Sequence, residues 1–453
     1  VAVLEGTKFG KPTQFWPAPS YLSMFARPMS ANVLAVVGTA AAIATAGPSC
    51  NADVHCPFDL SLLQLHAEVR STPKDRDASC TELANHGSYF TVLLEAGTPP
   101  QQFDVVADTG SDAVIIPSCM CREAGECPES DRCFVGSNTS ATFIVPEDRD
   151  VSVLNLEFGS GSIKAAVTTD VVHVGSMKAD MEEGLLLMVG RHLDIVGSFE
   201  GILGLGQLQS EYSSELVAGA SDSVHASWDR PHDDEALQVP IDQDQSAKVI
   251  VPGFLRKANV DRFSICFNDG ESPGVLRLGT KKEEGGVPSV GTLHWALDFL
   301  GISVGSASSD VLFCGDNKEE PACGAIPDSG TTVMLGPDDH IRSLFAGICD
   351  EWPRCARASR GDFAGRPKEE VFQIVLATCE EWLDEGEGLD ELPSIHMFVG
   401  SADKNRTIEL TPWSYVFESP MDEMEPHEQL LGDVGVSFAS VFAKHGLQEY
   451  ACA

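Results

Sequence analysis

Short apolar runs separated by turn residues dominate the chain from Tyr89 onward. Alternation of apolar and polar positions, closed by Gly, Pro or charged residues, is typical of strands. We expect strands on both sides of a turn at Gly97–Pro100 and over the segments 142–145, 151–158, 163–174, 185–189, 262–267 and 274–279. Long amphipathic helical runs are scarce, and Gly (41) and Pro (26) are frequent, so the pattern predicts an all-β fold.

Residues 207–247 interrupt this strand pattern. They combine nine Asp and Glu with a single Arg, among Ser, Ala and Pro. A segment of this composition buries little apolar surface, so we expect an exposed and mobile acidic insertion.

The N-terminal region predicts a route through the secretory pathway. Residues 31–46 are apolar and uncharged, Arg27 precedes them, and small residues follow at Ala44–Ala46. This is a signal-peptide pattern, with a buried or anchoring helix as the alternative. No other stretch reaches 18 apolar residues, so no stable membrane span is expected. We expect an upstream segment and signal peptide at 1–46 and a pro-segment or spacer at 47–80.

Asp108 stands at the end of an apolar run, where a lone buried carboxylate would be costly. The sequence from Asp108 to Ser111 reads Asp-Thr-Gly-Ser, and 220 residues later Asp328 to Thr331 reads Asp-Ser-Gly-Thr. An apolar-apolar-Gly step follows each copy, at 202–204 and 430–432. The repeated two-part pattern indicates an internal duplication that brings the two acids together.

Paired carboxyls have a defined chemistry. Two that lie close share one proton, so the pair can activate a water and protonate a carbonyl oxygen. The neighbouring residues fit this interpretation. Gly110 and Gly330 let the backbone approach the acids, Thr109 and Ser329 can bond across to the other half, and Ser111 and Thr331 can orient the carboxyls.

Composition and charge limit the partners and the cellular compartments that suit this chain. The 453-residue chain has 43% hydrophobic residues and a net charge of −38, from 30 Lys and Arg against 68 Asp and Glu. Such a chain is a poor candidate for binding nucleic acid, and an acidic compartment would relieve its charge repulsion. Its 14 Cys residues favour disulfides over a zinc cluster, since no His stands at ligand spacing; the pairing among Cys119, Cys121, Cys127 and Cys133 is open. Asn138 and Asn405 head glycosylation triplets.

The motifs of residues 85–453 resemble those of pepsin-like aspartic endopeptidases. The resemblance rests on the two Asp motifs, on FGSGS (158–162), FEGILGLG (199–206), FSICF (263–267), LPSIHMFVG (392–400) and LLGDV (430–434). It implies two β-rich lobes related by a pseudo-two-fold axis, at 81–262 and 263–453, with a cleft between them. It further implies a secreted or vacuolar zymogen, a polypeptide substrate, no metal or cofactor, and a monomer.

The resemblance also implies individual roles. Asp108 and Asp328 would be catalytic, and Phe158, Gly159 and Ser160 would form a flap over the substrate. Cys314 would pair with Cys323, and Cys379 with Cys349 or Cys355.

The sequence departs from the family at several positions. The family usually has Tyr where Phe158 stands and Trp where Ile115 stands, and an apolar Phe158–Ile115 contact would replace the hydrogen bond between them. Pro327 precedes Asp328 and removes a backbone N–H from a central strand. Ala443 stands where the family usually has Asp.

Three alternatives compete with an acid-acting endopeptidase. A pepsin-fold protein that binds peptides without cleaving them is favoured by Pro327, Phe158 and Ile115, and opposed by the intact motifs. Gly301–Gly305 fits the G-x-S-x-G spelling of a serine hydrolase, but no helical pattern follows. A metal enzyme has only the isolated His427–Glu428 pair in its favour.

Overall fold

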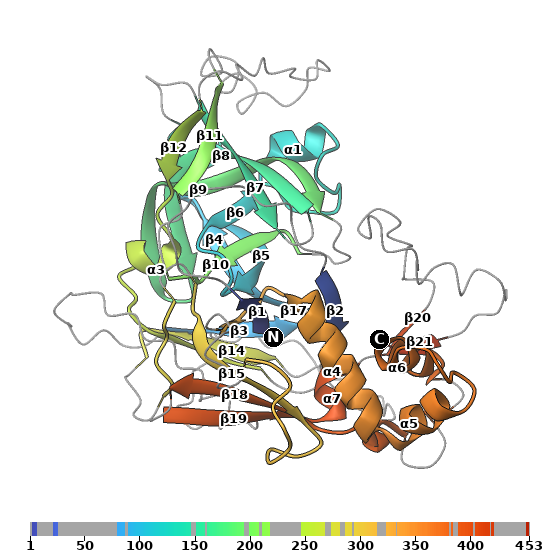
Figure 1. The fold of residues 1–453 in the computed structure, drawn as a ribbon. Helices are drawn as coiled ribbons and strands as arrows, with labels where there is room; N and C mark the ends of the chain where they lie inside the picture. The colour runs from blue at the N-terminus through green and yellow to red at the C-terminus, as the bar shows by residue number, and fades with distance from the viewer. Residues whose placement is uncertain are drawn as a thin grey trace, which may run out of the picture. The chain divides into compact units, whose positions relative to one another are not determined.

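A computed structural model gives the fold of the chain. It describes residues 2–6, 21–25, 79–86, 89–145, 151–158, 161–193, 199–207, 211–217, 246–267, 273–280, 286–291, 294–314, 323–331, 333–379, 382–383, 388–401, 404–416, 418–420 and 450–452. The expected signal peptide at 31–46, most of the 47–80 segment, the flap residues Gly159 and Ser160, and the 430–434 motif lie outside these residues, as does Ala443. The described part is mostly strands with few helices (Figure 1), so the all-β prediction is confirmed.

The chain divides into two compact units. Unit 1 comprises residues 1–29, 296–327 and 332–453, and unit 2 comprises residues 30–295 and 328–331. The sequence predicts a boundary at 262/263 between the two lobes. Strands 263–266 and 274–278 instead belong with unit 2, because the latter pairs with the strand at 79–85.

Unit 2 is built on a 12-stranded sheet of order β12-β11-β7-β8-β9-β6-β10-β5-β4-β3-β14-β13. Its strands are β3 (Ser79–Asn85), β4 (Phe90–Ala96), β5 (Gln101–Asp108), β6 (Val114–Pro117), β7 (Val151–Phe158), β8 (Gly161–Val174), β9 (Met177–Leu193), β10 (Gly201–Gly204), β11 (Glu211–Val217), β12 (Ser246–Ile250), β13 (Phe263–Cys266) and β14 (Gly274–Leu278). Two short helices, α1 (Cys119–Glu123) and α3 (Phe254–Lys257), accompany them. The segment 142–145 makes only an isolated bridge, from Ile144 to Thr169, and is not a strand.

The expected acidic insertion is partly sheet. Residues Glu211–Val217 form β11, which pairs with both β7 and β12. Residues 208–210 and 218–245 lie outside the described part, and residues 246–247 begin β12. The segment EYSSELV pairs on both edges although it contains two Glu, so an acidic composition does not by itself exclude a strand here.

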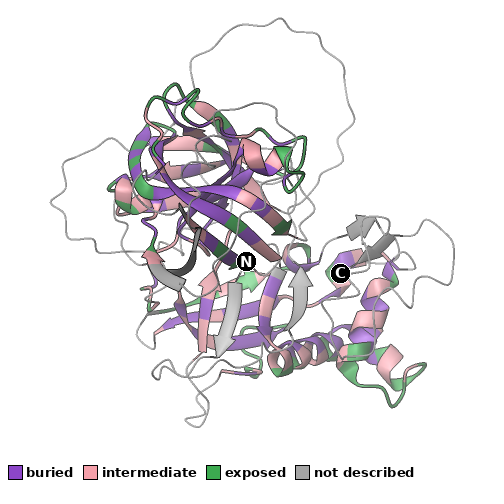
Figure 2. Ribbon diagram, turned by 90° about the horizontal axis from the view of Figure 1, so that it is seen from above, coloured by how far each residue is buried: buried purple, intermediate pink, exposed green. Residues whose placement is uncertain are grey.

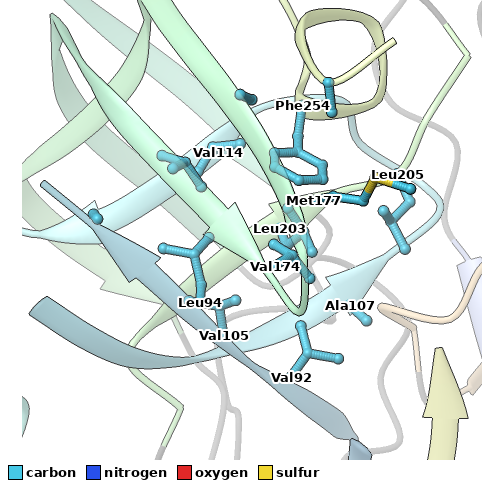
Figure 3. Packing of buried hydrophobic residues seen from close by; sticks show 14 of the residues in the cluster. Val92, Leu94, Val105, Ala107, Val114, Val174, Met177, Leu203, Leu205 and Phe254 are labelled. Atoms are coloured by element: carbon cyan, nitrogen blue, oxygen red, sulfur yellow. The ribbon is translucent and has the colours of Figure 1, made fainter. Parts of the chain in front are cut away.

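Alternate residues of β5 build the core of unit 2. Phe103, Val105 and Ala107 are buried on one face, and each full burial of a large apolar side chain contributes about 1.5–3 kcal/mol. Leu203 of β10 joins them in the same cluster, part of which Figure 3 shows. The packing fixes the end of β5, which is the position of Asp108.

Unit 1 contains a seven-stranded sheet of order β19-β18-β15-β16-β1-β17-β2. Its strands are β1 (Ala2–Gly6), β2 (Tyr21–Phe25), β15 (Leu297–Val304), β16 (Cys323–Pro327), β17 (Val333–Pro337), β18 (Ile395–Ser401) and β19 (Lys404–Leu410), with a separate pair β20 (Glu418–Pro420) and β21 (Tyr450–Cys452). Its helices are α4 (Asp338–Glu351), α5 (Pro353–Arg360), α6 (Lys368–Ala377), α7 (Pro412–Tyr415) and a 3-10 turn at Gly388–Glu391.

Helices α4 and α6 pack through aromatic side chains. Phe345 of α4 contacts Phe372 of α6 with ring centroids 5.0 Å apart, and Trp352 lies 5.1 Å from Trp382. Figure 2 shows buried residues along the strands and exposed residues gathered in loops and turns. Within the residue ranges given above, no helix is both long enough and apolar enough to cross a membrane.

The disulfides of the described residues revise one expectation. Cys119–Cys133, Cys121–Cys127 and Cys314–Cys323 are bonded. Cys349 is bonded to Cys355, so the expectation that Cys379 pairs with one of them is wrong. The bond is short-range because α4 ends and α5 begins between the two residues; Cys379 is disulfide-bonded elsewhere.

Candidate active site

Asp108 and Asp328 lie next to each other in unit 2. Asp108 is the last residue of β5 and is only 7% exposed, whereas Asp328 follows β16 and is half-buried. A Cβ atom added at Gly110 would lie 2.6 Å from Asp328 Oδ2, and one at Gly330 would overlap Asp108 Oδ1. Only glycine leaves each loop free to approach the carboxyl of the other.

Matching hydrogen bonds orient the two carboxyls. The Gly110 N–H donates to Asp108 Oδ1 at 2.8 Å, and the Ser111 hydroxyl donates to Oδ2 at 2.5 Å. The second copy repeats this arrangement. The Gly330 N–H and the Thr331 hydroxyl donate to Asp328 Oδ1 and Oδ2, at 2.8 and 2.6 Å.

The hydroxyls of Thr109 and Ser329 cross between the two motifs. The Thr109 N–H donates to Ser329 Oγ at 3.1 Å, and the Ser329 N–H donates to Thr109 Oγ1 at 3.0 Å. The Ser329 hydroxyl also donates to the Ala107 carbonyl at 2.6 Å. These bonds join residues 220 positions apart and hold the two acids in register.

The apolar-apolar-Gly step fixes the loop that follows Asp108. Strand β10 runs parallel to β5, with Gly204 beside Asp108, and antiparallel to β6, with Ile202 beside Ile115. The Leu205 N–H donates to the Asp108 carbonyl at 2.6 Å. A Cβ atom at Gly204 would collide with the backbone of Asp112, so glycine is required by close approach.

Burial and charge set the acidity of the pair. Burial, reinforced by the neighbouring Asp328 charge, raises the pKa of Asp108 to about 7, although the hydrogen bonds from Ser111 and Gly110 oppose the shift. At acidic pH Asp108 therefore carries a proton, and its deeper burial favours it over Asp328 as the carrier of the proton that the pair shares.

The other predicted residues take definite places. Phe158 ends β7 opposite Gly161 and packs against the cluster that contains Ile115, while a direct Phe158–Ile115 contact stays a prediction. Pro327 is the last residue of β16 and stands opposite Ala2 of β1, and it gives no N–H to this ladder.

The serine-hydrolase spelling at 301–305 forms no nucleophile site. Ser303 is fully buried in β15, and its hydroxyl donates to the Ser306 carbonyl at 2.8 Å. His396 faces it across the ladder, but the strand ends in a turn and not in a helix. The structure bears out the interpretation as a strand.

Sequence reasoning missed a charged network beside the disulfide-bonded loop at 119–133. Arg132 donates to Asp104 and to the buried Glu200, and Arg191 forms a buried ion pair with Asp131. The partners lie 28 to 68 residues apart, and no local pattern marks them.

Comparison with known proteins identifies the family. The family model described as "Eukaryotic aspartyl protease" matches residues 88–351, more than half of the chain, and the chain belongs to this family. Chymosin of Callithrix jacchus is 28% identical over 297 residues (62% of this chain, 65% of that protein). Vacuolar protease A of Neurospora crassa is 26% identical over 273 residues (58% and 56%), and Pregnancy-associated glycoprotein 1 of Ovis aries is 27% identical over 251 residues (55% and 56%). The chain thus spans between about half and two thirds of the length of these curated relatives.

Proposed function

We propose that the protein is an aspartic-type endopeptidase that hydrolyses peptide bonds with a water activated between Asp108 and Asp328. The observation that carries the proposal is the reciprocal arrangement of the two motifs, in which each glycine faces the opposite acid and each first hydroxyl residue bonds across. Such preorganisation fixes two carboxyls that share a proton.

The proposed reaction is general acid–base hydrolysis. The ionised carboxyl of the pair takes a proton from the water, whose oxygen attacks the carbonyl carbon of the substrate. The protonated carboxyl donates to the carbonyl oxygen. In the collapse of the tetrahedral intermediate the pair gives its proton to the nitrogen, the C–N bond breaks, and one hydroxyl of the intermediate returns a proton to the pair as the carbonyl re-forms. No covalent bond to the protein forms.

The raised pKa of Asp108 bears on the working pH. Activity requires one proton on the pair, so it should persist through acidic pH and fall as the pH rises through about 7. We propose a polypeptide substrate bound in extended form, with the hairpin of β7 and β8 closing over it. Disulfide bonds form in oxidising compartments, so we place the protein in the secretory pathway, outside the cell or in an acidic vacuole. Glycosylation at the exposed Asn138 and Asn405 stays a prediction.

Hydrolysis of a denatured protein between pH 2 and 7, with and without a pepstatin-type inhibitor, tests the proposal. We expect cleavage that is highest at acidic pH and lost in Asp108→Asn. The matched control is Asp170→Asn, since Asp170 is equally buried in unit 2 and an amide oxygen can still accept from Thr142 and Val171. Inhibitor binding without any cleavage would favour the peptide-binding alternative.

A further inference from the structure

Two disulfides close a loop whose side chains form ion pairs with the end of strand β9. The bonds Cys119–Cys133 and Cys121–Cys127 close residues 119–133, which we call the disulfide loop. Asp131 of this loop forms an ion pair with Arg191, with Oδ2 and Nη1 3.1 Å apart, and Glu126 lies 3.6 Å from His192. The loop is therefore attached to consecutive residues of β9.

The Arg191–Asp131 pair is buried. Its side chains are 8% and 5% exposed, and Arg191 also donates to the Phe199 carbonyl at 3.3 Å and lies 4.7 Å from the centre of the Phe199 ring. A buried ion pair adds little net stability compared with apolar residues of the same size, but removing one partner is strongly destabilising. What such a pair supplies is a defined geometry.

That geometry concerns the end of β9 that supports the flap hairpin, which we define as the paired strands β7 (Val151–Phe158) and β8 (Gly161–Val174). In the β8–β9 ladder Arg191 stands opposite Ile163, and Leu193 stands opposite Gly161. Gly161 is also the partner of Phe158 in the β7–β8 ladder. Arg191 is thus two residues along β9 from Leu193, which stands beside the Phe158–Gly161 end of the flap hairpin.

The next residue of the disulfide loop reaches the strand beside the candidate catalytic acid. Arg132 donates to both carboxylate oxygens of Glu200, at 2.7–3.0 Å, and its backbone N–H donates to Glu200 Oε1. Glu200 also accepts from the Asp104 N–H of β5 and directly precedes β10, which ends at Gly204 beside Asp108. One rigid loop thereby joins the flap side of the sheet to the strands that carry Asp108.

We propose that Arg191 and Asp131 are positioning residues that set the flap hairpin at a fixed distance from Asp108. The inference rests on the proposed function, because it assigns the Arg191–Asp131 ion pair a part in substrate binding at that site. Loss of the ion pair should lower the affinity for an extended peptide, with little effect on the chemistry at the paired carboxyls. The signature is therefore a raised KM with a nearly unchanged kcat.

The test compares single and double replacements. Arg191→Met leaves the buried Asp131 without its cation and, among the described residues, with only the Ser130 hydroxyl as a side-chain donor, so we expect a lower Tm together with a KM raised about tenfold and a kcat within about threefold. Asp131→Leu/Arg191→Met removes both charges and should recover the Tm while the KM stays raised. Arg191→Lys keeps the charge and should restore part of the KM. If the KM returns to the wild-type value together with the Tm in the double variant, the pair is only structural and the proposal is overturned.

A matched control lies in unit 1. Arg354 forms a partly buried ion pair with Glu391 at 2.8 Å, so Arg354→Met should lower the Tm without raising the KM. The dissociation constant of a pepstatin-type inhibitor separates this proposal from the proposed function. If the wild type binds the inhibitor without cleaving substrate, the proposed function fails. Roughly tenfold weaker inhibitor binding in both Arg191→Met and the double variant would still support the positioning role. Equal affinity in all variants, or no binding to the wild type, overturns it.

Discussion

Replacing Asp108 by Asn should make the protein more stable at neutral pH and leave its stability almost unchanged near pH 4. Burial and the Asp328 charge raise the pKa of Asp108 from 3.8 to about 7. Between these values the folded protein holds a proton that the unfolded chain has released, so the contribution of Asp108 to stability falls as the pH rises. Asparagine mimics the protonated carboxyl at every pH and removes this loss.

The size of the effect follows from the shift. Each pH unit of the interval corresponds to about 1.4 kcal/mol, so the variant should gain at most about 4 kcal/mol above pH 7. For a large domain this corresponds to a Tm increase of up to about 8 °C. Part of the gain in stability comes from removing repulsion by the Asp328 charge. The stability difference that Asp108→Asn makes should therefore be smaller, but not zero, when it is measured in an Asp328→Asn background.

Thermal unfolding of the variant and the wild type, at half-unit steps from pH 4 to pH 8, measures the effect. The difference in Tm should grow steadily with pH in favour of the variant. A difference that is independent of pH, or a variant that loses stability at pH 7.5, would refute a raised pKa for this buried acid.

Three further predictions concern the same structure. Gly330→Ala places a methyl group on the carboxyl of Asp108 and should reduce the hydrolysis rate about 100-fold or more, whereas a rate near that of the wild type would show that the loops do not approach as described. Thr109→Val leaves the Ser329 N–H without its acceptor and should lower the free energy of unfolding by about 1–3 kcal/mol; Thr109→Ser keeps the bond and serves as the control, and equal losses in both would contradict the crossing bond. A non-reducing peptide map should contain the Cys349–Cys355 pair, and a peptide joining Cys379 to either residue would contradict the short-range bond.

The candidate site could be predicted because two four-residue motifs contain both acids and the neighbours that contact them. Asp-Thr-Gly-Ser and Asp-Ser-Gly-Thr fix the order of acid, crossing hydroxyl, small residue and donor, and this order alone predicts the contacts of Gly110 and Ser329. The buried Arg191–Asp131 pair has no such local signal, because its partners lie 60 residues apart. Only the sheet register brings them together.

Helix α4 was missed although the sequence carries its signal. Ile341, Leu344, Phe345 and Ile348 recur at helical spacing, and Pro337 with Asp338 and Asp339 marks the start. The short strands on both sides favour a period of two, so the helical spacing within this segment is easily overlooked. The Cys349–Cys355 bond depends on the same helix, because the junction of α4 and α5 brings the two residues together.

The account depends on Asp108 and Asp328 acting as one unit, and the rates of Asp108→Asn, Asp328→Asn and the double variant on a denatured protein at acidic pH test this most directly. Because one proton is shared, either single replacement should lower the rate about 1,000-fold or more, and the double variant should be no slower than the single ones. A single variant that keeps substantial activity, or losses that multiply in the double variant, would contradict a shared catalytic pair.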